Sequence, residues 1–133
     1  MAKPRTPSCD RVPFDFARAA YVAGTFLMIP PVENLFANMG GSPAREEFIT
    51  LLQTNGVRVE RIVSNGQCSP EGFWYDQEEN EWVLLLRGTA SLEFEDGGRV
   101  ILKAGDYLGI ARHLRHRVGK ASADAVWLAV HHA

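Results

Sequence analysis

The chain has 133 residues, of which 46% are hydrophobic and 23% charged, the composition of one ordinary globular domain. Its formal net charge of −2 gives no general attraction to nucleic acid or to an anionic membrane, so we expect neither as a partner. Two cysteines far apart, Cys9 and Cys68, do not make a disulfide framework, which predicts a cytoplasmic protein.

Residues 1–27 are expected to form an N-terminal extension outside the main domain. They begin with a basic, proline-containing stretch and continue as FDFARAAYVAGTFL. Asp15 and Arg18 interrupt this apolar run, which therefore suits neither a membrane span of about twenty apolar residues nor a secretory signal. Two alternatives stay open, namely an amphipathic extension of the domain and a natural start at Met28.

Residues 43–55 are predicted to form a short helix near the start of a single domain that covers residues 28–133. Ser42 can cap this helix, and Gly56 follows its last turn. Phe48 and Leu52 recur at helical spacing, so the helix should pack one face against a larger element.

From residue 57 to about residue 131 the pattern changes to short strands. Val57 and Val59 alternate with Arg58 and Glu60, and later apolar runs follow at intervals of about ten residues. Gly-rich turns separate these runs, with no helical pattern between them. This arrangement indicates an all-β protein, an antiparallel sandwich or barrel.

Two stretches about twenty residues apart, EWVLLLRG and AGDYLGIARHLRHRV, carry a family resemblance. They resemble the two motifs of the cupin superfamily, and the chain is most similar to small, single-domain bacterial cupins of type-2-like sequence. Gly88 stands at the turn glycine of the first motif, which puts Glu81 at its glutamate, and His116 stands at the histidine of the second. Trp74 and Asp76 replace the two histidines of the first motif, so that metal motif is degenerate.

The resemblance implies an antiparallel cupin-type β-barrel, the double-stranded β-helix or jelly roll, over about residues 57–131. Small cupins commonly dimerise through an edge strand and the N-terminal segment, so the resemblance also implies a homodimer. It indicates where a site lies but does not specify a reaction.

Strand parity predicts which side chains meet inside the barrel. Trp74 and Asp76 are two residues apart and share a face, and a turn over residues 77–80 can bring Asp76 close to Glu81. His116 lies between two apolar alternate positions and should point inward. A carboxylate in such an apolar space must be paired, protonated or bound to metal.

These residues predict a divalent metal site of Asp76, Glu81 and His116, with His113 as a candidate fourth ligand. One imidazole and two carboxylates suit Zn, Mn, Ni or Fe. The alternative is a metal-free barrel, in which Glu81 and His116 hydrogen-bond each other.

Two functions follow from these alternatives. The first is the binding or conversion of a small polar organic or sugar-like molecule by isomerase-, epimerase- or lyase-type chemistry, with Glu81 and His113 as candidate proton-transfer residues. Trp74, Tyr107 and His131 are expected to line the substrate site. The second is a metal-free cupin that senses a ligand or serves as an interaction module without catalysis.

Overall fold

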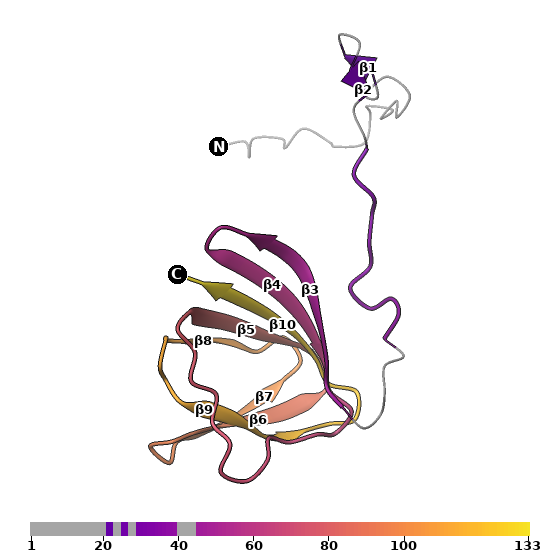
Figure 1. Cartoon of the computed structure of the whole chain (residues 1–133). Helices are drawn as coiled ribbons and strands as arrows, with labels where there is room; N and C mark the ends of the chain where they lie inside the picture. The colour runs from indigo at the N-terminus through magenta and orange to yellow at the C-terminus, as the bar shows by residue number, and fades with distance from the viewer. Residues whose placement is uncertain (1–20, 23–24, 27–28, 40–44) are drawn as a thin grey trace, which may run out of the picture. The chain divides into compact units, whose positions relative to one another are not determined.

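The structure, a computed structural model, describes residues 21–22, 25–26, 29–39 and 45–133 (Figure 1). The chain divides into two compact units between Asn34 and Leu35. In the first unit β1 (Tyr21–Val22) pairs antiparallel with β2 (Thr25–Phe26). The domain boundary expected after residue 27, and the start considered at Met28, lie outside the described residues.

The described residues of the second unit form eight strands in two sheets. They are β3 (Glu47–Thr54), β4 (Val57–Val63), β5 (Asn80–Arg87), β6 (Thr89–Phe94), β7 (Arg99–Lys103), β8 (Tyr107–Ile110), β9 (His116–Ala121) and β10 (Val126–His132). One sheet has the order β3-β4-β10-β5-β8 and the other the order β7-β6-β9, and all neighbours are antiparallel. Figure 1 shows the two sheets facing each other, so the predicted antiparallel all-β architecture is confirmed.

The predicted helix over residues 43–55 is wrong over its described part, because residues Glu47–Thr54 form strand β3. Asn55 and Gly56 make a two-residue turn in which Gly56, at φ 80°, is the hairpin glycine rather than the end of a helix. A β-bulge between Thr50 and Leu52 adds one residue to the strand, which gives the apolar positions their helix-like spacing. Pairing with β4 therefore outweighs a weak helical pattern.

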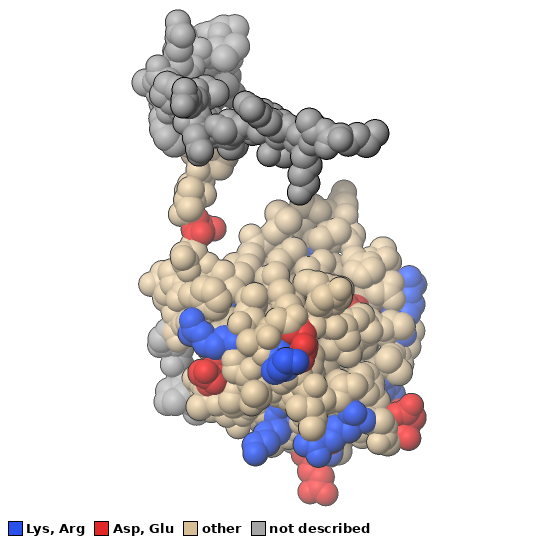
Figure 2. Space-filling model, turned by 180° about the vertical axis from the view of Figure 1, so that it is seen from behind, with Lys and Arg blue, Asp and Glu red and all other residues tan. Residues whose placement is uncertain are grey.

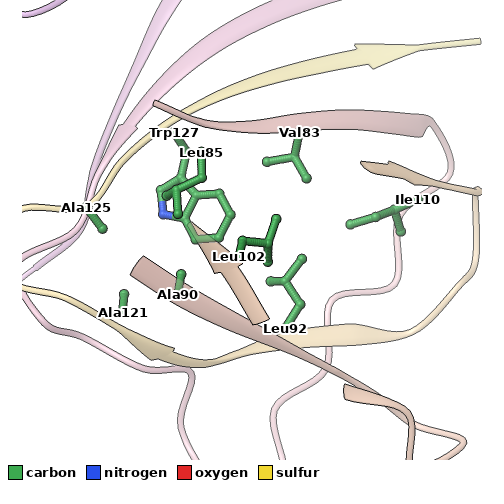
Figure 3. Packing of buried hydrophobic residues seen from close by; sticks show 9 residues of the cluster. All are labelled: Val83, Leu85, Ala90, Leu92, Leu102, Ile110, Ala121, Ala125 and Trp127. Carbon is green, nitrogen blue, oxygen red and sulfur yellow. The ribbon is translucent and has the colours of Figure 1, made fainter. Parts of the chain in front are cut away.

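The hydrophobic core lies between the two sheets (Figure 3). Its buried members are Val83, Leu85, Ala90, Leu92, Leu102, Ile110, Ala121, Ala125 and Trp127. Alternate residues of β5 point inward from Glu81 to Leu85, and Leu85 is fully buried. Small residues gather around Trp127 at one end of the core, and that end is therefore closed by packing (Figure 3).

A short strap, defined here as residues 35–38, is held by Arg61, whose side chain is 5% exposed. The Arg61 guanidinium donates to the carbonyls of Leu35 and Ala37 at 2.9 and 2.7 Å and to that of Asn38 at 3.4 Å. It also forms an ion pair of 2.9 Å with Glu47 at the start of β3. One buried cation thus joins the strap to both β4 and β3.

The molecular surface carries charges of both signs. On the face seen in Figure 2, Lys and Arg side chains alternate with Asp and Glu over the second unit. Over the described ranges, no helix has the length and apolar character needed to cross a membrane.

Candidate functional site

A cavity of about 130 Å³ opens between the two sheets. Its apolar floor is the surface of the hydrophobic core that faces the cavity. Val83, Leu92, Ile110 and Trp127 form this surface. Phe48 of β3 lines the wall and is 52% exposed, so the cavity reaches solvent on the β3 side. A volume of this size accommodates a ligand of about one six-membered ring.

The remaining wall of the cavity is rich in ionisable side chains. They are three carboxylates, Glu46, Glu60 and Glu81, two imidazoles, His116 and His131, and one guanidinium, Arg58. Tyr75 and Gln77 add polar groups from the loop before β5. Such a concave site, apolar at its floor and polar on its walls, is the usual form of a small-molecule pocket.

Glu81 and His116 form the deepest polar pair in the cavity. Glu81 is the first inward residue of β5 and His116 the first residue of β9, and their side chains are 9% and 7% exposed. Glu81 Oε2 lies 3.5 Å from His116 Nε2 and has no hydrogen-bond partner among the described residues. A buried carboxylate oxygen is therefore free to accept a hydrogen bond or a proton from a ligand.

The ring of His116 is held in one orientation. Its Nδ1 donates to the carbonyl of Leu114 at 2.8 Å, which directs Nε2 toward Glu81. The ring of Tyr75 stacks on it with centroids 5.5 Å apart and an interplanar angle of 27°. These two contacts fix where a proton on Nε2 would be delivered.

The surroundings of the pair shift two pKa values upward. Burial lowers the pKa of His116, but Glu81 and the Leu114 carbonyl raise it more, so its net pKa lies above the ordinary value. Burial also raises the pKa of Tyr75, and the nearby charges of Glu46 and Glu81 raise it further. The imidazolium is thus favoured next to Glu81, and the phenol stays neutral.

A second acid–imidazole pair lies in the same cavity. His131 Nε2 is 3.6 Å from Glu60 Oε2, and the side chain of His131 is 5% exposed. Arg58 Nε donates to Glu60 Oε1 at 2.6 Å, and its Nη1 lies 3.3 Å from Glu79 Oε1. Glu60 therefore faces a cation on one oxygen and an imidazole on the other.

The structure does not bring Asp76 to Glu81 and His116. Asp76 Oδ1 lies 2.9 Å from His113 Nδ1, and their side chains are 49% and 60% exposed. The segment from Phe73 to Gln77 presents Tyr75 and Gln77 to the cavity, which is the opposite parity to the one predicted. Asp76 and His113 consequently form a separate, solvent-exposed pair.

Two of the three predicted lining residues lie elsewhere, whereas His131 does line the cavity. Trp74 stacks under the guanidinium of Arg117, 5.0 Å from the ring centroid, and is not part of the cavity wall. Tyr107 is 65% exposed and packs against Trp82, with ring centroids 5.3 Å apart. These aromatic residues cover the outside of the barrel.

The Glu81–His116 pair offers few donor side chains to a divalent metal. Structural and catalytic zinc sites use three or four protein ligands. Glu81 and His116 supply two, and within residues 29–39 and 45–133 no three His, Cys, Asp or Glu side chains are grouped to hold a metal ion. The arrangement described here therefore does not fit a resident metal.

Several polar cavity residues were not expected from the sequence. Arg58 and Glu60 lie on the inward face of β4 with Ile62, although the alternation of Val57 and Val59 suggested the opposite face. Glu46 and Tyr75 lie outside or at the ends of regular strands, where parity gives no guidance. An alternation counted back from Ile62 would have identified Arg58 and Glu60.

Comparison with known proteins identifies the family. A family profile described as a cupin domain matches residues 62–131, just over half of the chain. The chain belongs to the cupin family, as the paired motifs suggested. No curated protein matches the sequence.

Solved structures agree with this fold. A protein from Ralstonia eutropha, provisionally named a mannose-6-phosphate isomerase, is 42% identical with a TM-score of 0.73, over 77% of this chain and 98% of that one. An RmlC-like cupin from Desulfovibrio desulfuricans is 15% identical with a TM-score of 0.65, over 78% and 97%. A cupin superfamily protein from Desulfitobacterium hafniense is 15% identical with a TM-score of 0.64, over 80% and 93%. At 15% identity, these last two support the fold alone.

Proposed function

We propose that this cupin binds a small hydroxylated carbonyl compound in its cavity and converts it by proton transfer, as an isomerase or epimerase does. The observation that carries the proposal is the free Oε2 of buried Glu81 beside His116. A carboxylate in this position can act as a general base, and an imidazolium can act as a general acid. The name of the Ralstonia eutropha relative, a provisional sugar-phosphate isomerase, supports the same class of reaction.

The proposed reaction needs no co-reactant, because each proton that is removed is returned to the product or to the protein. Glu81 takes the proton from the carbon next to the substrate carbonyl, and the electrons of that C–H bond form the carbon–carbon double bond of an enediol. His116 gives its Nε2 proton to the carbonyl oxygen. Return of the proton to the other carbon of the double bond, with transfer of the proton of the new carbonyl oxygen to His116, yields the isomer and restores both residues. Return to the original carbon yields the epimer only if the enediol presents its opposite face to Glu81.

The ring of Tyr75 and the carbonyl of Leu114 hold His116 for this transfer. The apolar floor keeps water away from the reacting carbon, which strengthens the electrostatic interactions in the site. No step is assigned to a metal, because the two donors brought together are fewer than a resident metal requires.

Hydrogen–deuterium exchange tests the proposal directly. Aldoses, ketoses and small hydroxy acids are incubated with the untagged protein in D₂O, and loss of the C–H signal next to the carbonyl is followed by NMR. Glu81→Gln should lower the exchange rate about 10²- to 10⁴-fold. Glu95→Gln, which alters only a surface pair with Arg115, is the matched control and should keep the full rate.

Two results would redirect the interpretation. Ligand binding without any exchange would favour the second function, a ligand sensor without catalysis. Near-stoichiometric Zn, Mn, Ni or Fe in protein purified without a tag, lost in Glu81→Ala and His116→Ala, would restore the metal site predicted from the sequence.

A further inference from the structure

The charges of the cavity are unevenly distributed between acids and bases. Three carboxylates line it, and of the described residues on its wall Arg58 is the only Arg or Lys. Carboxylates accept hydrogen bonds and repel anions. The wall therefore favours ligands that donate hydrogen bonds and carry no negative charge.

The guanidinium of Arg58 is already engaged by carboxylates. It contacts Glu60 at 2.6 Å and Glu79 at 3.3 Å, and its side chain is 32% exposed. An incoming phosphate would have to compete with both carboxylates for this cation. Phosphate sites are usually built from uncommitted Arg side chains or backbone N–H groups.

The two imidazoles of the cavity also face carboxylates. His116 directs Nε2 to Glu81 and donates through Nδ1 to Leu114, and His131 directs Nε2 to Glu60. Every basic side chain described on the wall is thus matched with an acid. Glu81 Oε2 lies 3.5 Å from His116 Nε2 but accepts no hydrogen bond among the described residues, so it is placed to receive one from a ligand hydroxyl.

We infer that the cavity selects an uncharged polyhydroxylated carbonyl compound and rejects the phosphate ester of the same compound. This inference rests on the proposed function for the position of the ligand, and it adds the substrate class. It separates this chain from a sugar-phosphate specificity such as the name of its 42% identical relative suggests. The small volume of about 130 Å³ agrees with a single unphosphorylated ring.

Mannose and mannose 6-phosphate are the matched probes, because they share their ring and differ by one phosphate. Each is titrated into the full-length protein, and the ring signals of His116 and His131 and the indole signal of Trp127 are followed by NMR. Mannose should bind at least about tenfold more tightly than its phosphate, which corresponds to about 1.4 kcal/mol. Equal or tighter binding of mannose 6-phosphate would overturn the inference.

Glu60→Gln provides a gain-of-binding test. The substitution frees Arg58 from its closer carboxylate and removes one negative charge, so affinity for mannose 6-phosphate should rise at least about tenfold. Glu95→Gln removes the same charge from an exposed ion pair outside the cavity wall and should leave both affinities unchanged. An unaltered phosphate affinity in folded Glu60→Gln would contradict the role given to Arg58.

These outcomes are separate from those of the deuterium-exchange experiment. If neither sugar binds, the polyhydroxylated class is wrong, while exchange on another hydroxy carbonyl compound would still support the proposed function. If mannose binds but no compound exchanges, the proposed proton transfer fails and the ligand class stands.

Discussion

Tyr75 and His116 are hydrogen-bonded to each other through their backbones in both directions. The N–H of Tyr75 donates to the carbonyl of His116 at 2.7 Å, and the N–H of His116 donates to that of Tyr75 at 3.2 Å. Their rings stack inside the cavity. This isolated bridge sets the parity of the loop before β5, and it turns Asp76 away from Glu81.

Glu81→Gln should lower the pKa of His116. Burial lowers that pKa, and Glu81 and the Leu114 carbonyl together outweigh burial, so loss of the Glu81 contributions would leave only the Leu114 carbonyl to oppose it. The pKa is measured from the ring signals of His116 in an NMR pH titration. Glu93→Gln, which changes an outer pair with Arg117, is the control, and an unchanged pKa in Glu81→Gln would contradict the coupling.

The stability of the protein should depend on pH through His116. Its folded pKa is raised above the unfolded value of about 6.5, so its stabilising contribution is complete below that pH and is lost as pH rises through the folded pKa. The difference in unfolding free energy between the parent and His116→Gln should therefore shrink from acid to alkaline pH in urea titrations. A difference that grows at high pH would disprove the assigned sign.

Arg61→Ala should destabilise the protein by about 3 kcal/mol, because it leaves the Glu47 carboxylate and three strap carbonyls without their donor. Arg117→Ala is the comparison, since Arg117 is 26% exposed and its pair with Glu93 should be worth less than about 1 kcal/mol. Urea unfolding measures both. Equal losses would show that the strap contacts add no stability.

Gly88→Ala should cost more stability than Gly56→Ala. Both glycines have positive φ, 83° and 80°, so both substitutions strain the backbone by about 1 kcal/mol or more. A Cβ at Gly88 would also clash with Ser122 Oγ and lie 3.0 Å from the backbone Cα of Ala125, whereas nothing lies within 4 Å of one at Gly56. Thermal unfolding of the two variants separates the clash from the strain, and similar melting temperatures would remove the clash from the explanation.

We propose that the homodimer expected from the resemblance forms through β3, one of the two edge strands of the larger sheet. Phe48, Ile49, Leu51 and Leu52 are 37% to 52% exposed there, and unpaired apolar edges favour association. Leu52→Lys should convert the full-length protein to a monomer in light scattering. Ile101→Lys, on the edge strand β7 of the smaller sheet and 77% exposed, should leave the dimer intact, and a monomeric parent would end the proposal.

The β-rich part of the fold could be predicted because its pattern is local. Alternation along β5 and the glycines of its turns specify short antiparallel strands whatever the neighbours are. Strand β3 could not be predicted, because its bulge hides the two-residue period and its hairpin glycine also resembles the end of a helix. Pairing with β4 decides whether this segment forms a strand or a helix, and the sequence of a single segment does not show with what it pairs.

The site could be predicted only where a residue belongs to a regular strand. Glu81 and His116 meet because each begins an inward-facing series on its own strand. Asp76 and Trp74 lie in a loop whose orientation depends on the distant bridge to His116, so counting residues gave the wrong parity there. Arg58 was missed because two valines beside it seemed to define the buried face of β4.

The smallest independently stable part of this protein should include the strap, because the strap accepts hydrogen bonds from the buried Arg61. Its carbonyl oxygens, rather than its side chains, contact the buried guanidinium, so replacing Leu35 or Ala37 by other residues should preserve the contact. Deleting these residues would leave Glu47, at the start of β3, as the one described hydrogen-bond partner of the Arg61 guanidinium, and the rest of this buried cation would have to be hydrated. Truncation limits for expression should accordingly be placed before residue 35, well upstream of the first barrel strand.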